Sequence, residues 1–125
     1  MILVDTSVWV DHLRSGVPQL VDLLNRSAVV MHPFVVGELA CGSLRNRSAL
    51  LTLLQDLPSA TTATDIEALA FIERRSLHGK GIGYVDVHLL ASVALTDGAA
   101  LWTRDKRLRA AAEVLGCAYL TTSDH

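Results

Sequence analysis

Met1-Ile-Leu-Val-Asp5-Thr-Ser-Val-Trp-Val10 is the stretch of sequence that decides the fold. Its apolar run, Ile2–Val4, is too short for a helix and suits a strand that is buried on both faces. The run ends at once in Asp5, and ligands bind just outside the carboxyl ends of strands in open α/β sheets. Asp5 also suits the N-cap of a helix that begins near Thr6. A ligand site and a helix cap are therefore both open interpretations of this residue.

Strands and helices alternate along the rest of the chain. Short apolar runs predict further strands at residues 28–31, 99–103 and 118–121. Helical periodicity and capping residues predict the intervening helices, over about residues 6–14, 18–24, 32–40, 48–57, 64–77 and 84–95, with a short one through Leu108 and Ala111. Ser48 is expected to cap the fourth of these helices, and Thr64 forms a capping box with Glu67 at the fifth. This alternation implies βαβ units and an α/β fold whose parallel sheet is covered on both faces.

Length and composition set limits on the class of protein. A chain of 125 residues is expected to form a single domain, residues 1–125. Half of the residues are hydrophobic and the mean hydropathy is +0.35, so we expect some apolar surface to be buried against another chain. The net charge of −2 excludes a generally basic protein that coats nucleic acid, but it does not exclude a local basic patch.

Cysteine usage and hydropathy indicate the compartment. Cys41 and Cys117 match no zinc-ligand spacing and are expected to be buried thiols in a reducing environment. No run approaches the ~18 apolar residues of a membrane span, so we expect a cytoplasmic protein with no membrane partner. The histidines show no metal-ligand spacing and are expected to be packing or surface residues: His12, His32, His78, His88 and His125.

Three acidic residues are expected at one edge of the sheet. Asp5 and Asp105 each follow a predicted strand, and parallel strands place all their carboxyl ends on the same side. Asp86 opens a predicted helix, and such a helix begins at that same edge in a βαβ fold. Each of the three, taken alone, could be a helix cap.

Glu38 is the acidic residue that a cap does not explain. It lies in Phe34-Val-Val-Gly-Glu38-Leu-Ala40, an otherwise apolar segment where a charged side chain is costly to bury without a partner. Four carboxylates at one edge would repel one another unless a cation joined them, and hard oxygen ligands suit Mg²⁺ or Mn²⁺. Such an ion can polarise a phosphate oxygen and supply hydroxide near neutral pH. The sequence therefore predicts a metal site.

The acidic motifs together resemble those of the PIN-domain nucleases. The motifs are Asp5-Thr6-Ser7 after the first strand, Glu38 on an apolar helix, Asp86-Val-His-Leu-Leu-Ala-Ser-Val-Ala-Leu95 at the start of a helix, and Asp97-Gly-Ala-Ala-Leu-Trp-Thr-Arg-Asp105. They span essentially the whole chain, and its small size is similar to that of the VapC-type toxins of bacterial and archaeal toxin–antitoxin pairs. The resemblance implies a three-layer α/β/α sandwich with a central, mostly parallel sheet.

The resemblance also implies a function. It indicates the toxin component of a type II toxin–antitoxin system, a Mg²⁺- or Mn²⁺-dependent endoribonuclease that hydrolyses RNA phosphodiester bonds by a metal-activated water. The catalytic and metal-binding residues would be Asp5, Glu38, Asp86 and Asp105, with small hydroxyl residues near the metal that match Thr6, Ser7 and Thr103 here. A homodimer and a cognate antitoxin protein that blocks the site are implied as well.

A basic run follows the last acidic strand end: Arg104, Lys106, Arg107 and Arg109. Runs of this kind are often only a solvated helix face. At the rim of a nuclease site the same residues would contact phosphates of the RNA substrate. Both interpretations stay open from the sequence.

Two rival functions have sequence arguments against them. A receiver-like phosphoacceptor domain needs an acceptor Asp after its central third strand, but Asp56 lies in a leucine-rich helical pattern. The second rival is a catalytically silent PIN-like module that only binds a partner. The intact acidic positions argue against it.

Overall fold

A parallel sheet of three strands, in the order β2-β1-β3, lies at the centre of the molecule. The structure is a computed structural model, and it describes residues 1–121. β1 (Ile2–Val4) pairs on one side with β2 (Val29–Val30) and on the other with β3 (Ala100–Trp102). Leu3 and Val4 are fully buried, because β1 has a strand on either side and helices pack over the sheet. The prediction of a strand buried on both faces is confirmed.

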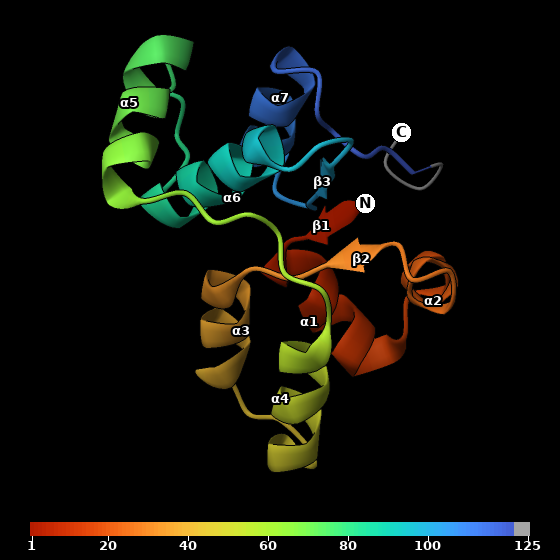
Figure 1. Cartoon of the computed structure of the whole chain (residues 1–125). Helices are drawn as coiled ribbons and strands as arrows, with labels where there is room; N and C mark the ends of the chain where they lie inside the picture. Colours follow the sequence, from red (N-terminus) through yellow and green to blue (C-terminus); the bar gives the residue numbers. More distant parts are fainter. Residues whose placement is uncertain (122–125) are drawn as a thin grey trace.

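Helices cover both faces of this sheet, as Figure 1 shows. They are α1 (Thr6–Ser15), α2 (Pro18–Asn25), α3 (Pro33–Ala40), α4 (Arg47–Asp56), α5 (Asp65–Arg75), α6 (Tyr84–Leu95) and α7 (Lys106–Val114). In that view α1 to α4 lie below the strands and α5 to α7 lie above them. The chain passes from β1 through β2 to Ser59, which bridges to Met31, in one direction across the sheet, and it returns to β3 in the other direction. Right-handed connections that run in opposite directions pass over opposite faces, so α1 to α4 and α5 to α7 lie on different sides. The predicted α/β fold with helices on both sides of a parallel sheet is confirmed.

α6 is the most deeply buried of these helices. Its residues 87–93 are all buried, and it packs against α5 and β3. A helix that is apolar nearly all round needs neighbours on every side. The side chains of Trp9 and Trp102 are buried as well. The core thus surrounds the ends of β1 and β3 and fixes the position of the residues that follow them.

Single-residue bridges extend the sheet at both edges. Leu101 bridges to Ala118, where the sequence predicts a longer strand at residues 118–121. β3 ends at Trp102, so it offers little backbone for a longer strand to pair with. At the other edge Met31 bridges to Ser59, a pairing that no sequence pattern predicts.

Two local predictions are wrong. Ser48 lies inside α4, and the N-cap is Asn46, whose backbone is left-handed with φ 50° and whose side chain makes no capping hydrogen bond. Asn tolerates this conformation, so the geometry of the turn sets the start of α4. Cys41 is exposed because it follows the last turn of α3 and leads into a loop. Cys117 is half-buried, and burial raises the pKa of its thiol.

Three further expectations concern membrane spans, His125 and the number of domains. No helix within residues 1–121 is long and apolar enough to cross a membrane. His125 lies outside the described residues. A single domain over residues 1–125 stays a prediction.

Candidate active site

Asp5 is held by two hydroxyl groups and does not cap a helix with its side chain. It occupies the N-cap position of α1, yet its side chain makes no capping hydrogen bond. Its Oδ2 accepts hydrogen bonds from Ser7 Oγ at 2.8 Å and from Thr103 Oγ1 at 2.7 Å. The residue is 7% exposed. Capping by the Asp5 side chain is therefore wrong, and the ends of β1 and β3 hold a nearly buried carboxylate between them.

The same two hydroxyls link the ends of the neighbouring strands. Ser7 Oγ accepts a hydrogen bond from the backbone amide of Arg104 at 3.1 Å. Thr103 Oγ1 accepts one from the amide of Asp105, also at 3.1 Å. Because a hydroxyl has a single proton, these amides leave that proton for the carboxylate of Asp5. Residues 98 positions apart in the chain thus form one hydrogen-bond network.

Asp105 and Asp86 each use one carboxylate oxygen at the start of a helix. Oδ1 of Asp105 caps α7 by accepting a hydrogen bond from the amide of Leu108 at 2.9 Å. Oδ2 of Asp86, in the first turn of α6, accepts one from the amide of Gly83 at 3.0 Å. The other oxygen of each residue accepts no hydrogen bond within residues 1–121. A cap therefore accounts for only half of each carboxylate.

Glu38 lies on an exposed face of α3, although its neighbours in sequence are apolar. Phe34 and Gly37 are exposed beside it, so the apolar segment does not bury the carboxylate. Thr6 Oγ1 donates a hydrogen bond to Glu38 Oε1 at 2.6 Å. This bond ties α3 to the first residue of α1, directly after Asp5. All three hydroxyl residues named from the sequence therefore contact a carboxylate of the set.

The carboxylates act on one another electrostatically. The pKa of Asp86 is raised, first by burial and then by the negative charges of Asp5, Asp105 and Glu38, while the amide of Gly83 opposes the rise. No Lys or Arg of the described residues forms an ion pair with any of the four acidic residues. The structure thus brings together Asp5, Glu38, Asp86 and Asp105, which we call the acidic cluster, and within residues 1–121 none of the four is ion-paired with a Lys or Arg.

The donor atoms of the acidic cluster fit a hard divalent cation. All of them are carboxylate oxygens, which suit Mg²⁺ or Mn²⁺ better than zinc. As they stand, no three His, Cys, Asp or Glu side chains in the part of the chain described lie close enough together to hold one ion directly. Mg²⁺ usually keeps several waters and contacts only one or two carboxylates. The donor set therefore suits an ion that contacts one or two of the carboxylates directly and reaches the others through water.

Comparison with known proteins places the chain in a family. The PIN domain family matches residues 2–114, a range that contains the whole acidic cluster. The chain belongs to the PIN domain family. Two similar proteins are named Ribonuclease VapC32, from Mycobacterium tuberculosis strains CDC 1551 / Oshkosh and ATCC 25618 / H37Rv. Each is 51% identical to this chain over 118 residues, which cover 94% of this chain and 95% of the relative. The resemblance to VapC-type PIN domains is confirmed.

The basic run of this PIN domain divides into paired and unpaired residues. Arg104 Nε lies 2.8 Å from Asp11 Oδ2, and Arg109 Nε lies 3.8 Å from Glu113 Oε1. Lys106 and Arg107 form no ion pair within residues 1–121. Internal ion pairs therefore occupy part of the run, and the whole run does not form a single free basic face.

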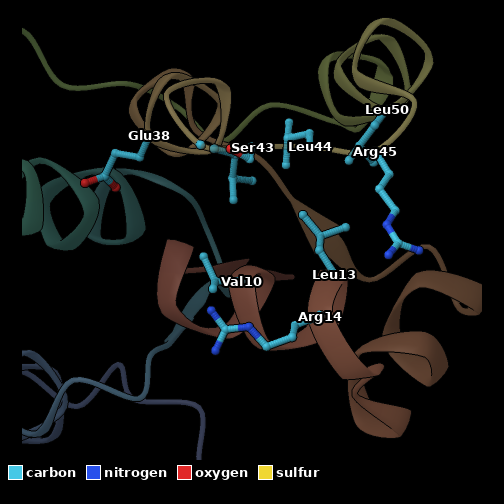
Figure 2. A pocket seen from close by; sticks show the side chains of 10 residues that line it. Val10, Leu13, Arg14, Glu38, Ser43, Leu44, Arg45 and Leu50 are labelled. Carbon is cyan, nitrogen blue, oxygen red and sulfur yellow. The ribbon is translucent and has the colours of Figure 1, made fainter.

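A groove reaches the acidic cluster from the side of α1 and α3. Its volume is about 660 Å³, and it is lined by Val10, Leu13, Arg14, Glu38, Leu39, Gly42, Ser43, Leu44, Arg45 and Leu50. Figure 2 shows Glu38 at one end of this groove and Arg45 at the other. Val10 and Leu13 are each 37% exposed, so its floor carries open apolar surface. We call it the Glu38 groove.

Two histidines that the sequence marks only as packing or surface residues hold the helices of the site. His32 is the N-cap of α3, and its Nδ1 accepts a hydrogen bond from the amide of Phe34 at 3.0 Å. Burial, and then the neighbouring charge of His88, lower the pKa of His32 to about 4. His88 Nε2 lies 3.2 Å from Asp65 Oδ1, which joins α6 to α5. Only the His32-Pro33 pair at a helix start signals such a role in the sequence.

Proposed function

We propose that this PIN domain is a divalent-metal-dependent endoribonuclease and the toxin component of a toxin–antitoxin pair. The observation that carries the proposal is the acidic cluster, whose charges raise the pKa of Asp86 and which has no Lys or Arg ion pair within the described residues. The 51% identity to proteins named as ribonucleases supports RNA as the substrate. Asp56 ends α4 and does not follow a strand, which argues against a receiver domain.

The proposed roles of the acidic cluster are to hold the cation and to accept a proton. Mg²⁺ or Mn²⁺ would be held by Asp5, Glu38, Asp86 and Asp105, and when bound it would neutralise their charge and acidify a water beside the scissile phosphate. Asp5 provides a fixed position, because two hydroxyls hold one of its oxygens. One carboxylate of the cluster accepts the proton that the attacking water loses.

The chain's own residues also make cleavage depend on the cation. Four carboxylates repel a phosphodiester when nothing compensates their charge. Thr6 and Thr103 keep Glu38 and Asp5 in place by hydrogen bonds that need no metal. The acidic cluster is therefore preorganised in part, and it accepts RNA only with the cation present.

An RNA cleavage assay tests this function. Purified protein should cut a structured RNA in Mg²⁺ or Mn²⁺, stop in excess EDTA, and leave 5′-phosphate and 3′-hydroxyl ends. Asp5→Asn should be inactive, and Asp97→Asn, in the exposed turn before β3, is the matched control that should stay active. Ends with a 2′,3′-cyclic phosphate, or cleavage in EDTA, would overturn the mechanism. Metal binding without any cleavage would favour the silent partner-binding module.

The Glu38 groove supports a protein antitoxin as the partner. Its apolar floor and its cations Arg14 and Arg45 suit an apolar segment flanked by acidic residues. A chain seated there would cover Glu38. Leu13→Arg should therefore weaken inhibition by the cognate antitoxin while cleavage in its absence continues. Equal inhibition of Leu13→Arg and the unaltered protein would argue against this binding mode.

A homodimer is the remaining part of the proposal. Leu53 on α4 is 65% exposed, and Ile66 and Leu69 on α5 are 81% and 56% exposed. Large apolar side chains exposed to this degree suit an interface between chains. Light scattering should give the mass of a dimer, and Ile66→Lys with Leu69→Lys should give a monomer. A monomeric mass for the unaltered protein would contradict the proposal.

A further inference from the structure

A second groove, separate from the Glu38 groove, lies between α7 and the end of α5. Its volume is about 330 Å³. It is lined by Arg75, Ser76, Leu77, Lys80, Arg107, Ala110, Ala111, Val114 and Leu115. Figure 1 shows α5 and α7 on the same side of the sheet, with α6 between them. We call this the α5–α7 groove.

Three cations from three separate segments meet at the α5–α7 groove. Arg75 ends α5, Lys80 lies in the glycine-rich loop, and Arg107 lies in the first turn of α7. None of the three forms an ion pair with a carboxylate of residues 1–121. Arg104 and Arg109, by contrast, are paired internally. Three cations that form no ion pair within residues 1–121 therefore line this one groove.

Gly81 brings the loop against the side chain of Arg107. A Cβ built on Gly81 would lie 2.6 Å from both Cδ and Nη1 of Arg107, so the arginine lies directly over the glycine backbone. Gly81 also has φ 77°, a conformation that other residues adopt only with strain. Both the close contact with Arg107 and the positive φ therefore require glycine at position 81. Its lack of a side chain lets Arg107 lie beside the loop that carries Lys80.

The α5–α7 groove is continuous in sequence with the acidic cluster. Lys80 lies in the loop that leads into α6, and Asp86 lies in the first turn of that helix. Asp105 is the N-cap of α7, and Arg107 follows it by two residues. Each of these two cations is therefore close in sequence to one carboxylate of the cluster. Apart from the cations the lining is mostly apolar, with Leu77, Ala110, Ala111, Val114 and Leu115.

We propose that the α5–α7 groove binds one nucleotide of the RNA substrate outside the bond that is cut. This inference rests on the endoribonuclease function proposed above. Arg75, Lys80 and Arg107 hold the phosphate, and the apolar floor receives the ribose or base. Continuity with the acidic cluster favours RNA over an acidic peptide. The groove offers positive charge to a substrate that the carboxylates alone would repel.

Basic residues inside and outside the groove provide a matched pair of double variants. Arg75→Gln with Arg107→Gln removes two cations that line the groove. Arg26→Gln with Arg74→Gln removes two exposed cations that do not line it, one after α2 and one in the last turn of α5. The two variant proteins have the same net charge, so a difference in their affinity for RNA is due to the groove.

Binding is measured in the Asp5→Asn background, which prevents cleavage. A short single-stranded RNA with a fluorescent label is titrated in Mg²⁺ by anisotropy over a series of salt concentrations. The groove variant should bind about 10-fold more weakly, and its salt slope should fall by about 0.7, since the one phosphate contact that it loses contributes roughly 0.7 for a single strand. The control variant should keep the salt slope and affinity of its parent. Equal changes in the two variants would overturn the proposal.

Cleavage assays on proteins that keep Asp5 separate this proposal from the function on which it rests. The groove variant should raise KM for RNA about 10-fold and change kcat less than about 2-fold, because it acts on binding away from the cut bond. If the unaltered protein neither binds nor cleaves RNA, the proposed function fails. If it does both and the two double variants behave alike, only the groove proposal fails. Should the groove variant unfold, Lys80→Glu, at an exposed loop position, must weaken binding in its place, and unchanged binding would again overturn the proposal.

Discussion

The two sides of the acidic cluster are held in different ways. On the strand side Asp5 is nearly buried and accepts two hydroxyl hydrogen bonds from residues after β1 and β3. On the helix side Glu38, Asp86 and Asp105 each accept a single hydrogen bond and are more exposed. The difference teaches that the sheet holds the carboxylate of Asp5 by hydrogen bonds alone. The three carboxylates on the helices are held less firmly, so in the proposed metal site they are the ones that a cation would draw together.

Replacing Asp5 removes the carboxylate of the strand side and should have the largest effect on RNA cleavage. Asp5→Asn keeps the shape of the side chain but removes its charge, so we expect cleavage to fall roughly 10²–10⁴-fold. An RNA cleavage time course measures it, with the thermal transition of the variant as a check on folding. Activity within about 3-fold of the unaltered protein would remove Asp5 from the site.

Acid should lower the free energy of unfolding through His32, which caps α3, the helix that carries Glu38 on the helix side. The pKa of His32 is lowered to about 4 by burial and then by His88, so the unfolded chain binds a proton that the folded chain resists. The associated stability is fully present above pH ~6.5 and is lost as the pH falls towards about 4, which amounts to roughly 3 kcal/mol. Urea unfolding over this pH range measures the loss.

His32→Asn is the control for that titration. Asn can accept the same hydrogen bond from the amide of Phe34 and does not titrate. The pH dependence of the free energy of unfolding between pH 6.5 and 4 should therefore become flatter. An unchanged pH dependence would assign the acid sensitivity to other groups.

Removing one hydroxyl from each side compares the two directly. Thr103→Val leaves the amide of Asp105 without its acceptor and removes a donor from Asp5, so we expect cleavage to fall about 10–100-fold and stability by about 1–3 kcal/mol. Thr6→Val removes one hydrogen bond to an exposed carboxylate, and stability should fall by less than about 1 kcal/mol. Kinetics and urea unfolding of both variants measure the difference. Equal effects would show that the two sides are held alike.

The strand side could be predicted from the sequence, whereas the helix side could be predicted only in part. Asp5 and Thr103 follow short apolar strands, and parallel strands bring such residues together wherever the helices lie. The exposure of Glu38 depends on which face of α3 packs inward, and the apolar segment around it does not reveal that. The cap of α4 and the exposure of Cys41 are harder still to predict. The turn at Asn46 and the loop after α3 depend on tertiary packing, which the local sequence does not reveal. The α5–α7 groove joins Arg75 to Arg107 across α6, and no local pattern connects them.

Asp86→Asn should have the smallest effect on folding and one of opposite sign. The pKa of Asp86 is raised by burial and by the other three carboxylates, so its ionisation costs stability once the pH exceeds that pKa. Asn keeps the acceptor for the amide of Gly83 and removes the charge. At pH 7 without divalent cations the variant should melt at a higher temperature than the unaltered protein.

This gain in melting temperature should vanish in acid, where Asp86 is protonated in both the folded and the unfolded state. It should shrink in Mg²⁺, because a bound cation relieves the same repulsion. Thermal unfolding at two pH values, with and without Mg²⁺, measures all three changes. A variant that melts lower at pH 7 would mean that the carboxylates do not strain one another, and the helix side would then need no cation to bring it together.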